Sequence, residues 1–286
     1  MTTKTSVSTI VNVGGGGAAL LLAVYALGSY MWADQKEPGC MADYQNIANF
    51  AFRSPDGRLM SAIEVQAQAG ADERGLMENT QIVELLSGPV DAALEVRLGR
   101  TDPADPMSAV GVDFAWRPLG LVAASSACLR YSIWLPNDFE FGTGGSLPGL
   151  FGGNAPALDG EKTTEGFAVR PKWTRDAVGE VLAESPVNDG GDAKSYGYRQ
   201  LAFERGRWTT IEQEVVLNSA GATDGKLRVW KDGVMLVDEH DVKLRDDEQT
   251  GISGVVARAG FLARGRGAPT GPRATLQLSP MEIGWR

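Results

Sequence analysis

Histidine and cysteine are scarce in this chain of 286 residues, which has one histidine, His240, and two cysteines, Cys40 and Cys128. Structural zinc sites are usually built from about four such side chains. The sequence therefore predicts no zinc site or Cys-based cluster, and nothing in it requires another metal or a cofactor. His240 stands among carboxylates, and we expect it to be a solvated residue.

Positive charge is also in deficit. The chain has 27 Lys and Arg against 36 Asp and Glu, a formal net charge of -9. Nucleic-acid binding depends on Lys and Arg neutralising phosphates, so nucleic acid is excluded as the main partner. An acidic polysaccharide stays possible because it needs only a locally basic groove.

Ionisable side chains are nearly absent from Thr5 to Ala33, where only Tyr25 and Tyr30 occur. Residues 10–32 are long enough to cross about 30 Å of hydrocarbon as a helix. We predict an uncleaved single-pass membrane anchor with the rest of the chain on the periplasmic or extracellular side. A cleaved signal peptide is the alternative, although four glycines interrupt the apolar run and no clear cleavage site follows it.

The two cysteines bear on the same question. In an exported protein an even pair predicts one disulfide, which here would tie Cys40, just after the anchor, to Cys128 in the following domain. Two unrelated buried thiols are the alternative.

Sustained helical periodicity is missing after the anchor, apart from a short predicted helix around residues 41–52. From residue 91 short apolar runs alternate with Gly, Pro, Asn and Asp, and residues 231–234 (Lys-Asp-Gly-Val) form a typical hairpin turn. About ten antiparallel strands predict an all-β fold, a two-sheet β-sandwich of the concanavalin-like jelly-roll type. The predicted organisation is a tail (1–9), the anchor (10–32), a juxtamembrane connecting region (33–90) and the sandwich (91–286).

The predicted strands are 93–98, 110–116, 127–135, 166–173, 179–184, 208–218, 227–231, 234–239, 254–262 and 275–285.

A glycine-rich stretch at residues 144–153, Gly-Gly-Ser-Leu-Pro-Gly-Leu-Phe-Gly-Gly, follows one of these strands. It resembles the GGKLPGLYGG signature of polysaccharide lyase family 14, the alginate-lyase-like sandwiches. Residues 206–218 and 225–233 resemble two further segments of that family. The resemblance implies a β-jelly-roll that acts on a uronate-containing polysaccharide by β-elimination, without a metal.

Two neighbouring strands carry charge on one face. Alternation places Arg170 and Lys172 together on the first, and Glu180 and Glu184 together on the second. If the strands pair as a hairpin through residues 174–178, these four side chains become cross-strand neighbours. They would form either an ion-pair ladder on a solvated face or the floor of a carbohydrate groove.

The resemblance also implies where the family's functional side chains should be. Its lysine falls on Ser146, its serine on Ala168, its arginine on Arg170, and its two tyrosines on Leu182 and Glu184. Only the arginine is retained, and a guanidinium that stays protonated cannot act as both acid and base. We therefore expect a degenerate site in which Ser146, Arg170, Lys172, Glu180 and Glu184 bind the glycan.

The sequence is consistent with three functions. The first is an anchored protein that binds an acidic cell-surface or exported polysaccharide without cleaving it. The second is an active lyase with a relocated residue set, for which Arg170, Tyr196 and Tyr198 are the catalytic candidates. The third is a structural or protein-interaction sandwich, whose protein partners the sequence does not identify.

A basic, glycine-rich stretch at residues 258–267, with Arg273 nearby, is either a polyanion-binding loop or a solvated loop.

Overall fold

The structure is a computed structural model that describes residues 39–70, 73–98, 111–142, 144–154, 165–188, 193–261 and 274–286. The predicted tail and membrane anchor lie outside these residues. Among the described residues, no helix has the length and apolar character needed to cross a bilayer.

The described strands form two antiparallel sheets, which we name after their central strands. The strands of the β6 sheet are β1 (Asn46–Phe50), β3 (Thr80–Glu84), β4 (Ala92–Leu98), β6 (Ser126–Trp134), β12 (Trp208–Val216), β13 (Gly225–Lys231), β14 (Val234–Val242), β17 (Ala274–Leu278) and β18 (Met281–Trp285). Those of the β9 sheet are β2 (Glu73–Arg74), β5 (Asp113–Trp116), β7 (Gly145–Ser146), β8 (Gly149–Gly152), β9 (Phe167–Trp173), β10 (Val178–Glu184), β11 (Lys194–Ala202), β15 (Ile252–Val256) and β16 (Gly260–Phe261).

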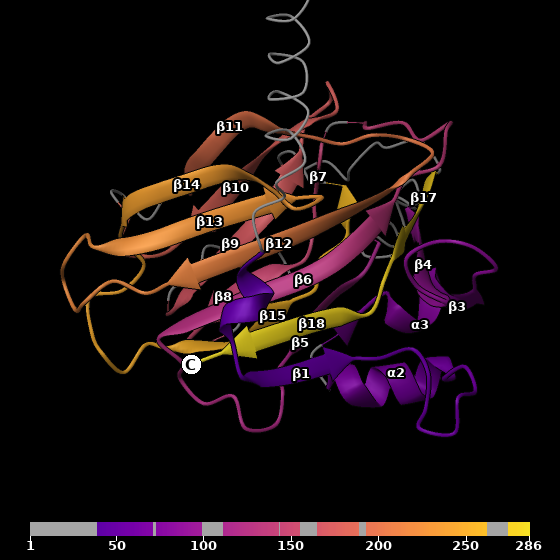
Figure 1. Cartoon of the computed structure of the whole chain (residues 1–286), viewed down its shortest axis with the longest axis horizontal. Helices are drawn as coiled ribbons and strands as arrows, with labels where there is room; N and C mark the ends of the chain where they lie inside the picture. The colour runs from indigo at the N-terminus through magenta and orange to yellow at the C-terminus, as the bar shows by residue number, and fades with distance from the viewer. Residues whose placement is uncertain are drawn as a thin grey trace, which may run out of the picture. The chain divides into compact units, whose positions relative to one another are not determined.

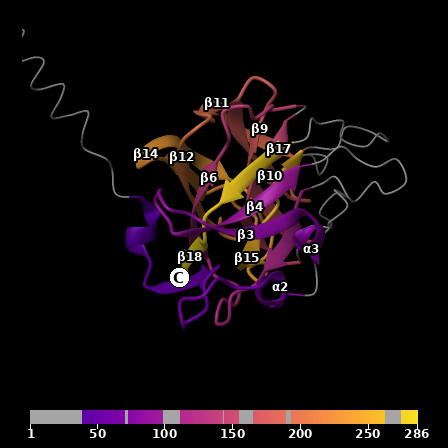
Figure 2. The same cartoon turned by 90° about the vertical axis from the view of Figure 1, so that its right-hand side faces the viewer.

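Strand order places distant segments side by side. The β6 sheet runs β14-β13-β12-β6-β17-β4-β3, with β18 also beside β6 and β1 beyond β18. The β9 sheet runs β11-β10-β9-β8-β15-β5-β2, with β7 beside β9 and β16 beside β7. Figure 1 looks onto the β6 sheet, and Figure 2, turned by 90°, shows the two layers from the side. The predicted two-sheet antiparallel sandwich is confirmed.

The core lies between the sheets, where alternate side chains of each strand are buried. Two buried polar side chains of the β6 sheet reach across this core. The Tyr131 hydroxyl donates to the Pro148 carbonyl at 3.0 Å, and the Gln213 amide donates to the Val169 carbonyl at 3.0 Å. Both acceptors belong to the segment that includes the glycine-rich stretch and β9, so the β6 sheet helps to hold that segment in place.

The predicted connecting region is not separate from the sandwich, and this boundary is corrected. From Gly39 onward the chain forms one compact unit. It includes the short helices η1 (Cys40–Asp43), α2 (Ala62–Ala69) and α3 (Leu76–Asn79). Strands β1, β2 and β3 all pair with strands of the two sheets.

The predicted helix at residues 41–52 is wrong, because only η1 is helical there and β1 follows it. Strand β1 pairs along its whole length with β18, and Phe50 is fully buried with its ring stacked 5.1 Å from that of Phe114. Pairing with a strand more than 200 residues away has overridden the local helical spacing.

Two predicted C-terminal strands are interrupted. The run predicted at 254–262 divides into β15 and β16, and the run at 275–285 is broken at Ser279-Pro280, where proline has no N–H to donate to a ladder. The predicted hairpin turn is confirmed, with both Asp232 and Gly233 at positive φ (52° and 80°) between β13 and β14.

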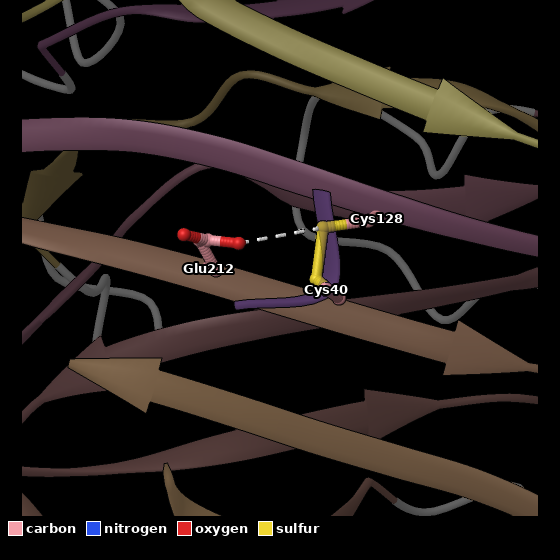
Figure 3. Close-up of side chains that lie close together, drawn as sticks. All are labelled: Cys40, Cys128 and Glu212. Carbon is pink, nitrogen blue, oxygen red and sulfur yellow. Dashed lines mark hydrogen bonds between the residues drawn. A yellow bond between two sulfur atoms is a disulfide. The ribbon is translucent and has the colours of Figure 1, made fainter. Parts of the chain in front are cut away.

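The predicted disulfide is confirmed: Cys40 and Cys128 are bonded, with their Cα atoms 5.8 Å apart. It fastens η1 to the outer face of β6, over a cluster that includes Met41, Tyr44 and Trp230. Figure 3 shows the Glu212 carboxylate beside the disulfide, and its Oε2 is 3.9 Å from Cys128 Sγ. The same oxygen accepts a hydrogen bond from the Met41 N–H. Because the sulfurs are bonded to each other, they are not thiolate ligands for a metal beside Glu212.

Candidate functional site

The charged hairpin predicted from the sequence is present as β9 and β10. Lys172 lies directly opposite Glu180, and its Nζ is 2.6 Å from Glu180 Oε1. Arg170 lies opposite Leu182, and it forms an ion pair with Glu184, which is two residues further along β10 on the same face. The four charged side chains therefore form two ion pairs on one face.

These side chains are largely withdrawn from water. The exposed fractions are 11% for Arg170, 20% for Lys172, 8% for Glu180 and 32% for Glu184. Glu180 also accepts a hydrogen bond from the Ser195 hydroxyl of β11. A solvated ion-pair ladder would leave the charges exposed, so the burial favours the alternative prediction of a groove floor.

The glycine-rich stretch borders this face. Ser146, on β7, lies directly opposite Lys172. A Cβ added at Gly149 would lie 2.1 Å from the Val169 carbonyl oxygen and 2.9 Å from Arg170 Cγ, and one at Gly145 would overlap the Trp173 ring. These glycines therefore make room for Arg170 and for a core tryptophan.

A third ion pair joins the same face from β5 and the segment after β15. Arg258 Nε is 3.4 Å from Asp113 Oδ2, and both side chains are buried. Burial lowers the pKa of Arg258, an effect that Asp113 partly offsets, and Arg170, Glu184 and Arg74 also act on it electrostatically. Arg258 thus belongs to a buried charge cluster, although the sequence predicted it at the start of a basic loop. Residues 262–267 of that stretch, and Arg273, lie outside the described residues.

We name this set the β9-face cluster. Arg74, on β2, lies directly opposite Asp113 of β5 and joins the same face. The members are Arg74, Asp113, Arg170, Lys172, Glu180, Glu184 and Arg258. Asp113 and Arg74 are the members that sequence reasoning missed, since their strands are short and the pairing that joins them to β9 runs through β8 and β15.

The two tyrosine candidates lie elsewhere. Tyr196 pairs with Val181, on the face of β10 that packs into the core, and is buried there with Lys194 Nζ 4.8 Å from its ring centroid. Tyr198 is 64% exposed, in the stretch of β11 where the register with β10 shifts. His240 is on β14 of the other sheet, with its Nε2 3.4 Å from Asp238 Oδ1. The structure therefore does not bring Tyr196 together with Arg170.

This arrangement sets limits on the chemistry. β-Elimination on a uronate requires charge neutralisation at the carboxylate, a base for the C5 proton and an acid for the leaving oxygen. Within the part of the chain that the structure describes, the β9-face cluster offers guanidinium, ammonium and carboxylate groups, and no tyrosine or histidine. It can bind an anionic or hydroxyl-rich ligand through charge-assisted hydrogen bonds.

The two packed antiparallel sheets form a β-sandwich of jelly-roll type with a charged outer face. Residues 92–262 match the profile of the family Polysaccharide lyase 14, and the chain belongs to this family. No curated protein sequence matches it.

Solved structures agree on the fold. The marine PL-14 alginate lyase from Aplysia kurodai superposes with a TM-score of 0.63 at 22% identity, over 75% of this chain and 89% of that chain. Alginate lyase vAL-1 from Chlorella virus gives 0.63 at 16% identity, over 78% and 97%. Alginate lyase Aly36B gives 0.63 at 13% identity, over 84% and 97%. At these identities the likeness establishes the jelly-roll architecture.

Proposed function

We propose that this protein binds an acidic polysaccharide through the β9-face cluster and has lost lyase activity. The observation that carries the proposal is the Arg170–Glu184 ion pair. Arg170 matches the family's arginine, whereas Glu184 stands where the family's signature implies a tyrosine. The group expected to hold a uronate is kept, and a group expected to move a proton is replaced.

The guanidinium of Arg170 supports an anionic ligand. A sugar carboxylate can compete with Glu184 for Arg170, because a guanidinium offers several donors in a fork that suits carboxylates. A variant of the structurally similar lyase Aly36B was crystallised in complex with alginate trisaccharide, which supports a glycan ligand for this fold.

The loss of lyase activity is supported by the placement of the tyrosines. Tyr196 is buried on the core side of β11, so it does not share the Arg170 face as a proton-transfer residue would, and Tyr198 is exposed in the stretch of β11 where the register shifts. The alternative lyase with a relocated residue set has no such geometric support. A sandwich that serves only protein interaction leaves the buried ion pairs of β9 and β10 without a role.

We also propose that residues 10–32 anchor the protein in a membrane with the sandwich on the periplasmic or extracellular side. The Cys40–Cys128 disulfide supports this location, since disulfides persist in oxidising compartments.

The test is retention of the full-length chain on immobilised alginate, together with ultraviolet absorbance of unsaturated uronate products. We expect retention without product, and loss of retention in Arg170→Ala. Arg207→Ala is the matched control, because Arg207 is a half-exposed arginine paired with Glu204 at the start of β12. Equal retention of the two variants would show that the β9-face cluster is not the binding site, and formation of product would establish the lyase.

A further inference from the structure

The outer face of the β6 sheet, opposite the β9-face cluster, holds a cavity of about 540 Å³. Strands β1, β18, β6 and β12 lie side by side there, as Figure 1 shows, and the loop before β4 closes one side with Pro89 and Val90. The side chains that the strands contribute to the cavity are mostly polar, whereas those of the loop, Pro89 and Val90, are apolar. Sugar-binding sites need this combination, since a sugar ring presents hydroxyls at its rim and C–H groups on its faces.

A row of charged and amide side chains crosses four strands at one end of the cavity. Strand pairing places Asn49 opposite Glu282, Glu282 opposite Arg130, and Arg130 opposite Glu212. Arg130 Nε donates to Glu282 Oε2 at 2.7 Å, and its Nη2 donates to the same oxygen. Glu282 Oε1 and Arg130 Nη1 are therefore available to a ligand, and hydrogen bonds from charged groups are the strong ones.

The next row along β6 and β12 consists of two hydroxyls. Ser132 and Thr210 lie directly opposite each other, with their side-chain oxygens 2.9 Å apart. Because each hydroxyl has one hydrogen and two lone pairs, their mutual bond leaves one hydrogen and several lone pairs for a ligand. Such a pair can both donate to and accept from a sugar hydroxyl.

A third row extends the surface beyond the cavity. Trp134 and Trp208 lie directly opposite each other, two residues along from Ser132 and Thr210, and both are half-buried. The backbone at Gly88 lies against the Trp208 indole, which connects this row with Pro89. Aromatic rings offer apolar faces on which the C–H side of a sugar can pack. Three rows two residues apart span about 14 Å, more than a single sugar ring.

The charges of this surface decide which glycans fit. Glu212 and Glu282 flank one guanidinium, so the row has an excess of carboxylate and repels an anionic chain. We propose that the Arg130, Ser132 and Trp134 rows form a second binding site, which takes a neutral, hydroxyl-rich glycan. This inference does not depend on the function proposed for the β9-face cluster, because the two sites lie on opposite sheets and select opposite charge.

The test uses the full-length chain and three neutral probes, cellohexaose, mannohexaose and maltohexaose, in titration calorimetry. We expect at least one to bind, with Kd at least about tenfold higher in Thr210→Val and in Arg130→Met, a change of about 1.4 kcal/mol. The first variant removes a hydroxyl while keeping the side chain's shape, and the second removes the charge. Nuclear magnetic resonance of the indole N–H groups should show the Trp208 signal moving on titration.

Controls separate this proposal from the previous one. Arg170→Ala should bind the neutral probe as the unchanged chain does, and Thr210→Val should keep its retention on alginate. Thermal unfolding identifies any variant that fails to fold. If one of Thr210→Val and Arg130→Met does not fold, the affinity of the other and the Trp208 signal test the proposal. The proposal is overturned if none of the three probes binds, or if a probe binds with the Trp208 signal and both variant affinities unchanged.

Discussion

At the scale of single residues, Glu184 governs what Arg170 can do. The two are paired on a face where Arg170 is only 11% exposed, so a ligand carboxylate must displace Glu184 before it can reach the guanidinium. The same carboxylate repels an incoming uronate. One side chain thereby sets the affinity of the proposed site.

Glu184→Gln should therefore bind alginate oligosaccharides more tightly. Two unit charges about 4 Å apart in water interact by about 1 kcal/mol, which corresponds to about a fivefold lower Kd. Glu204→Gln, in the ion pair with Lys231 of the β6 sheet, is the control and should leave Kd unchanged. Weaker binding by Glu184→Gln in titration calorimetry would contradict the proposed role of Arg170.

Tyr131 provides a second prediction at this scale, on stability. Tyr131→Phe leaves the buried Pro148 carbonyl without its 3.0 Å hydrogen bond and should lower the free energy of unfolding by about 1–3 kcal/mol. Urea denaturation would measure this difference. Tyr198→Phe, at a 64% exposed tyrosine, should unfold at the unchanged midpoint; equal midpoints for both variants would show that the core hydrogen bond contributes nothing.

At the scale of elements, local chemistry accounts for α2. The Ser61 side chain caps the helix by accepting from the Glu64 N–H, and the Glu64 carboxylate accepts from the Ser61 N–H. Arg58 Nη1 also donates to the Glu64 carboxylate, at 2.9 Å. The hydrogen bond from Arg58, followed by those from Ser61, holds the pKa of Glu64 well below its usual value. Capping boxes of this kind define where a short helix begins.

Because that pKa is lower in the folded than in the unfolded chain, Glu64 stabilises the fold above its unfolded pKa. This contribution should decline as the pH falls below about 4.3 and vanish below the folded pKa. Glu64→Gln should therefore be less stable than the unchanged chain at neutral pH, with the difference shrinking in acid. Exposed Glu140→Gln is the comparison, and a difference in urea midpoint that is constant with pH would contradict the assignment.

Elements with strong local signals could be predicted from the sequence, and elements that depend on distant partners could not. The β13–β14 turn has an Asp-Gly pair, and alternation in β9 and β10 places Arg170 correctly. By contrast, β1 carries helix-like spacing, and its pairing with β18 has no local signal. Arg258 stands in a glycine-rich basic stretch, and only the tertiary fold shows that it is buried against Asp113.

At the scale of the whole molecule, the disulfide closes a sequence separation of 88 residues. Replacing both cysteines, Cys40→Ala with Cys128→Ala, should lower the free energy of unfolding by about 2–4 kcal/mol, because the unfolded chain regains the freedom the bond removes. Chemical denaturation measures the loss, and the unchanged chain under a thiol reductant should match the variant. Identical midpoints with and without the bond would contradict a stabilising role.

The position of that bond also determines how the sandwich would respond to mechanical force. A pull on the chain ahead of Gly39 reaches the Cys40–Cys128 bond first and passes into β6, which is flanked by paired strands on both sides. The edge strand β1 comes after the bond and is shielded from this load, so it would not be peeled from β18. In an oxidised chain pulled from its N-terminus, the force should therefore act first on the central strand β6. In a reduced chain it should act first on the edge strand β1.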